Sequence, residues 1–184
     1  MSRIRKAYDA LVASGELRPD QAQASVADRL DTLAHRLEQP ARKPGLLRKL
    51  FGGNPAPAPQ GLYLWGGVGR GKSMLMDLFF THVAVEPRKR IHFHQFMLET
   101  HARIFARRQS DPGDPLPAVA KSWADEARLL CFDELQVTNI ADAMILSRLF
   151  TALLASGVTV VATSNRPPVD LYKDGLSREL FLPF

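Results

Sequence analysis

The chain has 184 residues, of which 46% are hydrophobic and 23% are charged, and its formal net charge is +5. This composition is ordinary for a globular protein and excludes a wholly disordered chain. The single cysteine, Cys131, excludes an internal disulfide, and no apolar run approaches the roughly 18 residues that a membrane-spanning helix needs.

Residues 1–51 are predicted to form a helical region, with helices over 2–14 and 20–39. The second helix starts near Asp20, because aspartate is a favoured N-cap residue. Its apolar residues recur at helical spacing, at Ala24, Ala27, Leu30, Ala34 and Leu37. Residues 52–60 are rich in glycine and proline and are predicted to be a linker, which leaves 61–184 as the core domain.

A glycine-rich stretch matches the phosphate-binding loop pattern, with a first glycine, four free positions, and then Gly-Lys-Ser. It follows a predicted strand at Leu62–Trp65 and precedes a predicted helix at 74–80, which is the order that phosphate binding needs. Backbone N–H groups and the helix start attract phosphate there. The residues expected to bind nucleotide are Gly66, Gly67, Val68, Gly69, Arg70, Gly71, Lys72 and Ser73. Lys72 is expected to reach the outer phosphates, and the Ser73 hydroxyl to bind Mg²⁺. Trp65 is interpreted as a core residue and not as a surface on which a base stacks.

The next strand is predicted at 90–94, and a helix follows over 97–108 before a loop at 111–115. His92 and His94 would share one face of that strand. No cluster of further ligand residues accompanies them in the sequence, so packed histidines are favoured over a metal site.

Two carboxylates, Asp133 and Glu134, follow a continuous apolar run at Leu129–Phe132. Such a run is typical of a parallel strand covered on both faces, and open α/β sheets bind ligands at the carboxyl ends of their strands. Asp133 is expected to hold Mg²⁺ together with Ser73. Glu134 is expected to orient or deprotonate the water that attacks the γ-phosphate. An ordinary charged turn is the alternative, and the phosphate loop argues against it.

A helix is predicted over 139–155 and a strand over 158–163, followed by Asn165. If that strand neighbours the Asp133 strand, the Asn165 amide would lie beside the γ-phosphate and could align the lytic water. The alternative is a turn-forming asparagine before Arg166 and two prolines.

Together, these motifs resemble the AAA+ branch of phosphate-loop ATPases. The stretches GLYLWGGVGRGKSMLMDLFF, RIHFHQFMLETH, LLCFDELQVTNIADAMILSRLF and VVATSNRPPVDLYKDGLSRELFLPF are similar to those of ZapE-type bacterial cell-division ATPases and their mitochondrial AFG-like relatives. The similarity runs from about Gly61 to Phe184 and is weaker in the N-terminal helices. It implies a three-layer α/β fold with a parallel sheet of order 5-1-4-3-2, ATP and Mg²⁺ as cofactors, and the tubulin-like division protein as partner.

The resemblance also implies an arginine that reaches the γ-phosphate of a neighbouring subunit. Arg178 matches that position, although a solvent-facing helix arginine is the alternative, and Arg166 is a second candidate. The family continues past LFLPF with a fifth strand, a helical lid and a further arginine. The chain is therefore expected to be a fragment or a shortened gene product, in which Leu62–Trp65 forms an exposed apolar edge.

Basic residues gather in three clusters, within 42–49, at 88–90 and within 103–108. The first is interleaved with apolar residues and can touch a membrane surface or a protein, although a solvated helix end is favoured. Aromatic interleaving is sparse, which disfavours nucleic acid as a partner.

The expected function is Mg²⁺-dependent ATP hydrolysis that drives action on a protein partner. The expected location is the cytoplasm, with peripheral contact at the inner membrane or division site, and a homo-oligomer is compatible with the sequence. The alternative is a nucleotide-gated interaction module with little turnover. No guanine-reading Asn-Lys-x-Asp pattern is present, so adenine is preferred to guanine.

Overall fold

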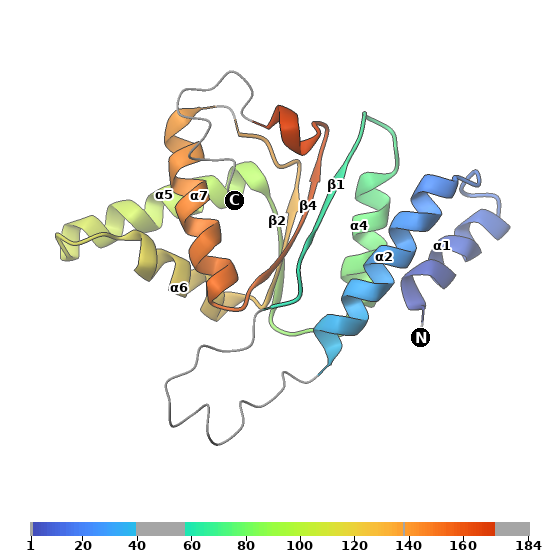
Figure 1. The fold of residues 1–184 in the computed structure, drawn as a ribbon, viewed down its shortest axis with the longest axis horizontal. Coiled ribbons are helices and arrows are strands. Elements are labelled where there is room, and N and C mark those ends of the chain that lie inside the picture. Colours follow the sequence, from blue (N-terminus) through green and yellow to red (C-terminus); the bar gives the residue numbers. More distant parts are fainter. Residues whose placement is uncertain (1, 40–57, 138, 172–184) are drawn as a thin grey trace.

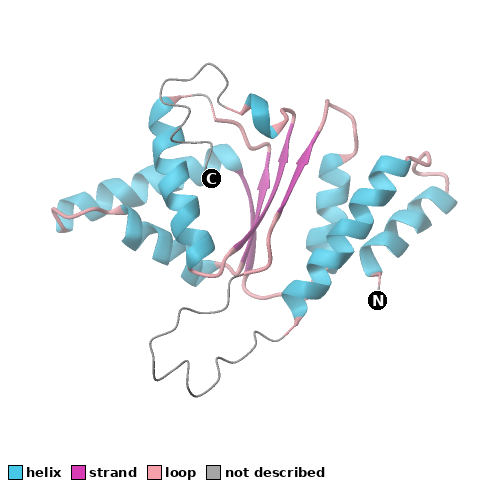
Figure 2. Cartoon of the chain, in the orientation of Figure 1, coloured by secondary structure: helices cyan, strands magenta, loops and turns pink. Residues whose placement is uncertain are grey.

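The computed structural model describes residues 2–39, 58–137 and 139–171. Its four parallel strands are β1 (Leu62–Trp65), β2 (Arg88–His92), β3 (Leu129–Asp133) and β4 (Thr159–Ser164). They form one sheet in the order β1-β4-β3-β2, with helices on both faces (Figures 1 and 2). The predicted three-layer α/β fold is confirmed, and β1 lies at an edge of the described sheet.

One face of the sheet is covered by α4 (Lys72–His82), and α1 (Arg3–Ala13) and α2 (Gln21–Glu38) pack outside it (Figure 1). The other face is covered by α5 (Phe93–Ser110), α6 (Leu116–Glu126) and α7 (Ile140–Ala155). Alternate residues of β3 point to the two sides. Leu129 and Cys131 belong to the core under α4, whereas Leu130 and Phe132 belong to the core under α5, α6 and α7.

The start of α2 lies where the sequence predicts it. Asp20 is the N-cap residue, and its Oδ1 accepts hydrogen bonds from the backbone N–H groups of Ala22 (2.8 Å) and Gln23 (3.1 Å). The hydroxyl of Tyr8 in α1 donates to the Asp20 carbonyl at 3.0 Å. These contacts fix the first turn of α2 against α1.

The region between residues 88 and 126 differs from the prediction. Strand β2 ends at His92 and α5 begins at Phe93, so His94 lies in the helix and the two histidines do not share a strand face. The helix begins early because Phe93 and Phe96, one turn apart, both pack on Phe132, with ring centroids 5.8 and 4.6 Å away. Helix α6 was missed, although its apolar spacing is helical: Leu116, Val119, Ala120 and Trp123.

Ion pairs neutralise much of the two basic clusters that the structure describes. In the cluster at 88–90, Lys89 lies 3.1 Å from Glu126 and Arg88 lies 3.4 Å from Glu86. In the cluster within 103–108, Arg103 lies 2.7 Å from Glu126. The cluster within 42–49, residues 52–57 of the predicted linker, and Arg178 lie outside the described residues. Within the described part of the chain, no helix has the length and apolarity to cross a membrane.

Cys131 is expected to resist thiol reagents in the folded protein. Burial raises the pKa of its thiol from 9.0 to about 12, so almost none of the reactive thiolate is present at pH 8. We expect Ellman's reagent to label the native protein at least about 100-fold more slowly than the protein unfolded in urea. The folded protein also keeps a proton that the unfolded chain loses above pH 9, so this group lowers stability as the pH rises from 9 toward 12. Rapid labelling of the native protein would contradict this prediction.

Candidate functional site

The phosphate loop Gly66–Ser73 connects β1 to α4. Gly69 and Gly71 have φ values of +77° and +78°, a conformation that L side chains rarely adopt. Gly71 is the N-cap of α4, so the helix begins at Lys72 and not at 74 as predicted. The first backbone N–H groups of an α-helix have no partner within the helix and attract anions. The conformation therefore presents N–H groups where a phosphate would be bound.

The Lys72 side chain folds back over this loop. Its Nζ donates hydrogen bonds to the carbonyl oxygens of Gly66 at 2.7 Å and Gly67 at 2.8 Å. The positive charge is therefore held against the loop backbone, next to the helix start, where a polyanion gains the most from it.

A cavity of about 360 Å³, here called the phosphate cavity, brings three predicted parts of the site together. Its lining comes from the loop, from the turn after β3 and from the end of β4: Val68, Gly69, Arg70, Gly71, Lys72, Ser73, Met74, Glu134, Thr163, Ser164 and Asn165. Glu134 and Asn165 are both exposed to solvent and so can reach a ligand. Strand β4 lies directly beside β3, as the expectation for Asn165 required.

The turn that carries Glu134 has an unusual backbone. Among the described residues, Glu134 is the one non-glycine residue with positive φ, at 57°, a conformation that costs about 1–3 kcal/mol. Its backbone N–H donates to Thr163 Oγ1 at 3.1 Å, and the N–H of Leu135 donates to the Thr163 carbonyl at 2.7 Å. Ser164 Oγ in turn donates to the Leu135 carbonyl at 2.8 Å. The end of β4 therefore holds Glu134 in this position.

Asp133 is oriented by Arg90, which in the sequence stands out only as a member of the basic cluster at 88–90. Arg90 Nε lies 2.7 Å from Asp133 Oδ2, and Arg90 Nη2 lies 3.1 Å from Oδ1. The same guanidinium pairs with Asp77 of α4. Burial lowers the pKa of Arg90, but its hydrogen bonds to Asp133 and Asp77 outweigh this effect and raise the pKa above its usual value. Arg90 thus connects β2, β3 and α4, the helix that follows the phosphate loop and is here called the loop helix.

Asp133 opens onto a second space, a cavity of about 290 Å³ that it lines together with Glu134 and His92. In the described part of the chain, no group of three or more His, Cys, Asp or Glu residues could hold a metal ion. Mg²⁺ needs few protein ligands when phosphates supply the rest, and it prefers oxygen donors. The Ser73 hydroxyl and the Asp133 carboxylate fit that requirement by type, and their role remains a prediction.

Replacing Arg90 with methionine is expected to destabilise the fold. The Asp133 side chain is only 13% exposed, so its carboxylate would lose both hydrogen bonds in a largely buried position. We expect the free energy of unfolding to fall by about 1–3 kcal/mol, measured by urea denaturation. Arg128→Met is the matched control, because Arg128 is exposed and precedes β3. Equal stabilities of the two variants would contradict the role given to Arg90.

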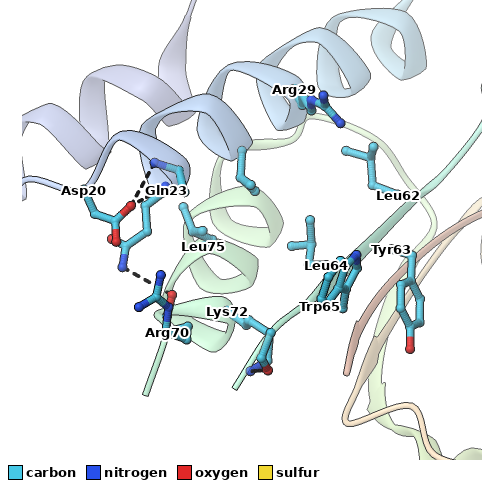
Figure 3. A pocket seen from close by; sticks show the side chains of 13 residues that line it. Asp20, Gln23, Arg29, Leu62, Tyr63, Leu64, Trp65, Arg70, Lys72 and Leu75 are labelled. Carbon is cyan, nitrogen blue, oxygen red and sulfur yellow. Dashed lines mark hydrogen bonds between the residues drawn. The ribbon is translucent and has the colours of Figure 1, made fainter. Parts of the chain in front are cut away.

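A third cavity, of about 410 Å³, lies between α2, β1 and the phosphate loop and is here called the α2–β1 cavity (Figure 3). Its lining includes the apolar residues Val26, Leu62, Leu64, Trp65 and Leu75, together with charged residues such as Asp20 and Arg29. The interpretation of Trp65 as a core residue is wrong, because its side chain is 58% exposed at the edge strand. This cavity shares Arg70 and Lys72 with the phosphate cavity, so the two spaces adjoin at the loop.

Comparison with known proteins gives a consistent family. The model of the AFG1-like ATPases matches residues 2–184. The cell division protein ZapE of Escherichia coli K12 is 44% identical over an alignment 179 residues long, and this alignment covers 92% of this chain and 47% of that protein. Lactation elevated protein 1 homolog B of Danio rerio is 53% identical over an alignment 135 residues long, and this alignment covers 68% of this chain and 27% of that protein. The chain thus spans about half, or less, of these relatives.

Solved structures agree with the fold. The DnaI crystal structure superposes with a TM-score of 0.58 at 13% identity and covers 91% of this chain and 78% of that one. AMPPCP-bound DnaA from Aquifex aeolicus superposes with a TM-score of 0.54 at 14% identity, and the match covers 89% of this chain and 44% of the DnaA chain. At this level of identity the likeness concerns the fold alone.

Proposed function

We propose a function from one premise: this chain belongs to the AFG1-like ATPase family. It binds ATP and hydrolyses it to ADP and phosphate with the aid of Mg²⁺, and it uses the cycle to act on a protein partner. One observation carries the proposal. The phosphate loop, Glu134 and Asn165 come from three separate parts of the chain and line a single cavity.

In this mechanism the loop N–H groups and Lys72 bind the β- and γ-phosphates and offset the charge that develops on them. Mg²⁺, when bound at Ser73 and Asp133, would neutralise charge on the same phosphates. Glu134 accepts a proton from the attacking water or orients it. Asn165 aligns that water through its neutral amide, and the hydrogen bond to Thr163 Oγ1 holds the backbone of Glu134, from which the carboxylate projects.

A second candidate is a nucleotide-gated interaction module in which binding orders a surface and turnover is slow. The pairing of Asp133 with Arg90 favours it, because a carboxylate held by an arginine is less free to support Mg²⁺. ATP binding without measurable phosphate release would select this candidate.

By analogy with the Escherichia coli relative, which is named as a cell division protein, we propose a protein partner in cell division for this chain. The tubulin-like division protein is the partner that the family resemblance suggests. The proposed location is the cytoplasm near the division site, with peripheral contact at the inner membrane. Arg178 is proposed to act on the nucleotide of a neighbouring copy in a homo-oligomer.

The test of the proposed activity is a pair of measurements on the 184-residue chain. ATP binding is measured by calorimetry with and without Mg²⁺, and phosphate release is followed as protein concentration rises. If an arginine acts between copies, the release per molecule should increase with concentration. Absence of ATP binding at millimolar nucleotide would overturn the proposal.

A further inference from the structure

Gln23, in the first turn of α2, contacts the phosphate loop from a distant part of the sequence. Its Nε2 donates a hydrogen bond to the carbonyl oxygen of Arg70 at 3.2 Å (Figure 3). The amide packs so closely on the loop that a Cβ at Gly71 would lie 2.8 Å from Nε2. This bond fixes the orientation of the amide, because a flipped group would set its oxygen against the Arg70 carbonyl.

The other end of the same amide is unsatisfied. Gln23 Oε1 is buried and has no hydrogen-bond partner. Among the described residues, it is the one buried side-chain nitrogen or oxygen atom without a partner. A buried acceptor without a donor costs free energy, and such groups in native proteins call for an explanation. Gln23 lines the α2–β1 cavity, so a ligand there that displaces the atoms covering Oε1 could supply the missing donor.

The α2–β1 cavity suits a flat heteroaromatic ring. Apolar side chains of α2 and α4 line it on one side and those of β1 on the other, and Asp20, Arg29 and Lys72 add charged groups to its lining (Figure 3). The exposed Trp65 ring can pack against such a ligand. The cavity adjoins the phosphate cavity at Arg70 and Lys72. A ligand with an aromatic group at one end and phosphates at the other would therefore span both.

We propose that Gln23 determines the base specificity of this site, by accepting a hydrogen bond at Oε1 from the exocyclic amino group of an adenine in the α2–β1 cavity. Its Nε2 meanwhile holds the Arg70 carbonyl, so one side chain joins base recognition to the phosphate loop. Adenine has an amino donor where guanine has a carbonyl oxygen, and an acceptor facing that oxygen would be repelled. This inference rests on the proposed function, since it concerns the same nucleotide.

The test compares ATP, GTP and inorganic tripolyphosphate, each with Mg²⁺, by calorimetry on the full chain. Gln23→Met keeps the length of the side chain and removes both hydrogen bonds. The preference for ATP over GTP is expected to fall by about tenfold or more. If the substitution only loosened the loop, the binding of ATP and GTP would weaken equally, and tripolyphosphate binding would weaken as well. Gln21→Met, on the exposed surface of the same helix, is the control and should keep the preference.

A second variant tests the cavity without touching Gln23 or the loop. Val26→Trp places a large ring in the α2–β1 cavity. It is expected to weaken ATP binding by about tenfold or more and to leave the affinity for tripolyphosphate within about twofold of that of the unmodified chain. If the unmodified chain binds ATP but shows no preference for ATP over GTP, or if Gln23→Met keeps that preference, the inference is overturned while the proposed function stands. An unchanged ATP affinity in Val26→Trp would place the base outside the α2–β1 cavity and would also overturn the inference. If the unmodified chain binds neither ATP nor tripolyphosphate, the proposed function fails, and this inference fails with it.

Discussion

Replacing Glu134 with glutamine is expected to reduce ATP turnover by at least about 100-fold while ATP still binds. The substitution keeps the shape of the side chain but removes the basic oxygen, and general base catalysis contributes about 10²- to 10⁴-fold in enzymes. The turn at Glu134 is held through the backbone and Thr163, so the variant should fold normally. Phosphate release and calorimetric ATP binding are measured on the same preparation.

Glu86→Gln is the matched control for this experiment. Its side chain is 73% exposed and lies just before β2, at the opposite end of the strands from the phosphate cavity. Turnover in the control should equal that of the unmodified chain. Unchanged turnover in Glu134→Gln would remove Glu134 from the mechanism, and loss of ATP binding would show that Glu134 supports the nucleotide and not the water.

Replacing Lys72 with alanine is expected to weaken ATP binding by about 100-fold. The ammonium group donates hydrogen bonds to the loop carbonyls of Gly66 and Gly67, so its charge lies against the loop backbone. Hydrogen bonds to charged groups contribute about 1.5–3 kcal/mol, and about 2.7 kcal/mol corresponds to a factor of 100. Binding is measured by competition with a fluorescent ATP analogue.

Lys121→Ala controls for the loss of a positive charge. Lys121 is 74% exposed on α6, on the face of the sheet away from the loop helix. The Lys121→Ala variant should bind ATP with the same affinity as the unmodified chain. An unchanged affinity in Lys72→Ala would mean that the phosphates lie elsewhere, and the assignment of the loop would be wrong.

The parts of the site that the sequence predicted are those with a local pattern. The phosphate loop is a continuous motif, Asp20 caps the helix that it precedes, and the buried strand before Asp133 is continuously apolar. Each of these depends on neighbours within a few residues, which single-sequence reasoning can weigh. The placement of Asn165 beside the loop also followed, because it required only that β4 lie next to β3.

The parts that the sequence did not reveal depend on contacts between distant segments. Gln23 and Arg70 are 47 positions apart, and Arg90 and Asp133 are 43 positions apart. Nothing in either sequence neighbourhood indicates the partner, because the pairing is set by strand register and by how α2 packs. Trp65 was misjudged for a related reason: its hydrophobicity favours the core, but an edge strand left its ring exposed.

The hydrogen bonds at the end of β4 have a mechanical consequence. Thr163 and Ser164 hold the left-handed turn at Glu134, and the Ser164 carbonyl accepts from the N–H of Gly66 at 3.3 Å. Asn165 is the next residue along the chain. A displacement of this one strand tip by a fraction of an ångström would move the proposed base, the water-aligning amide and the mouth of the loop in concert. A protein that pulls on the segment after β4 would thus have a lever for switching hydrolysis on or off as a unit.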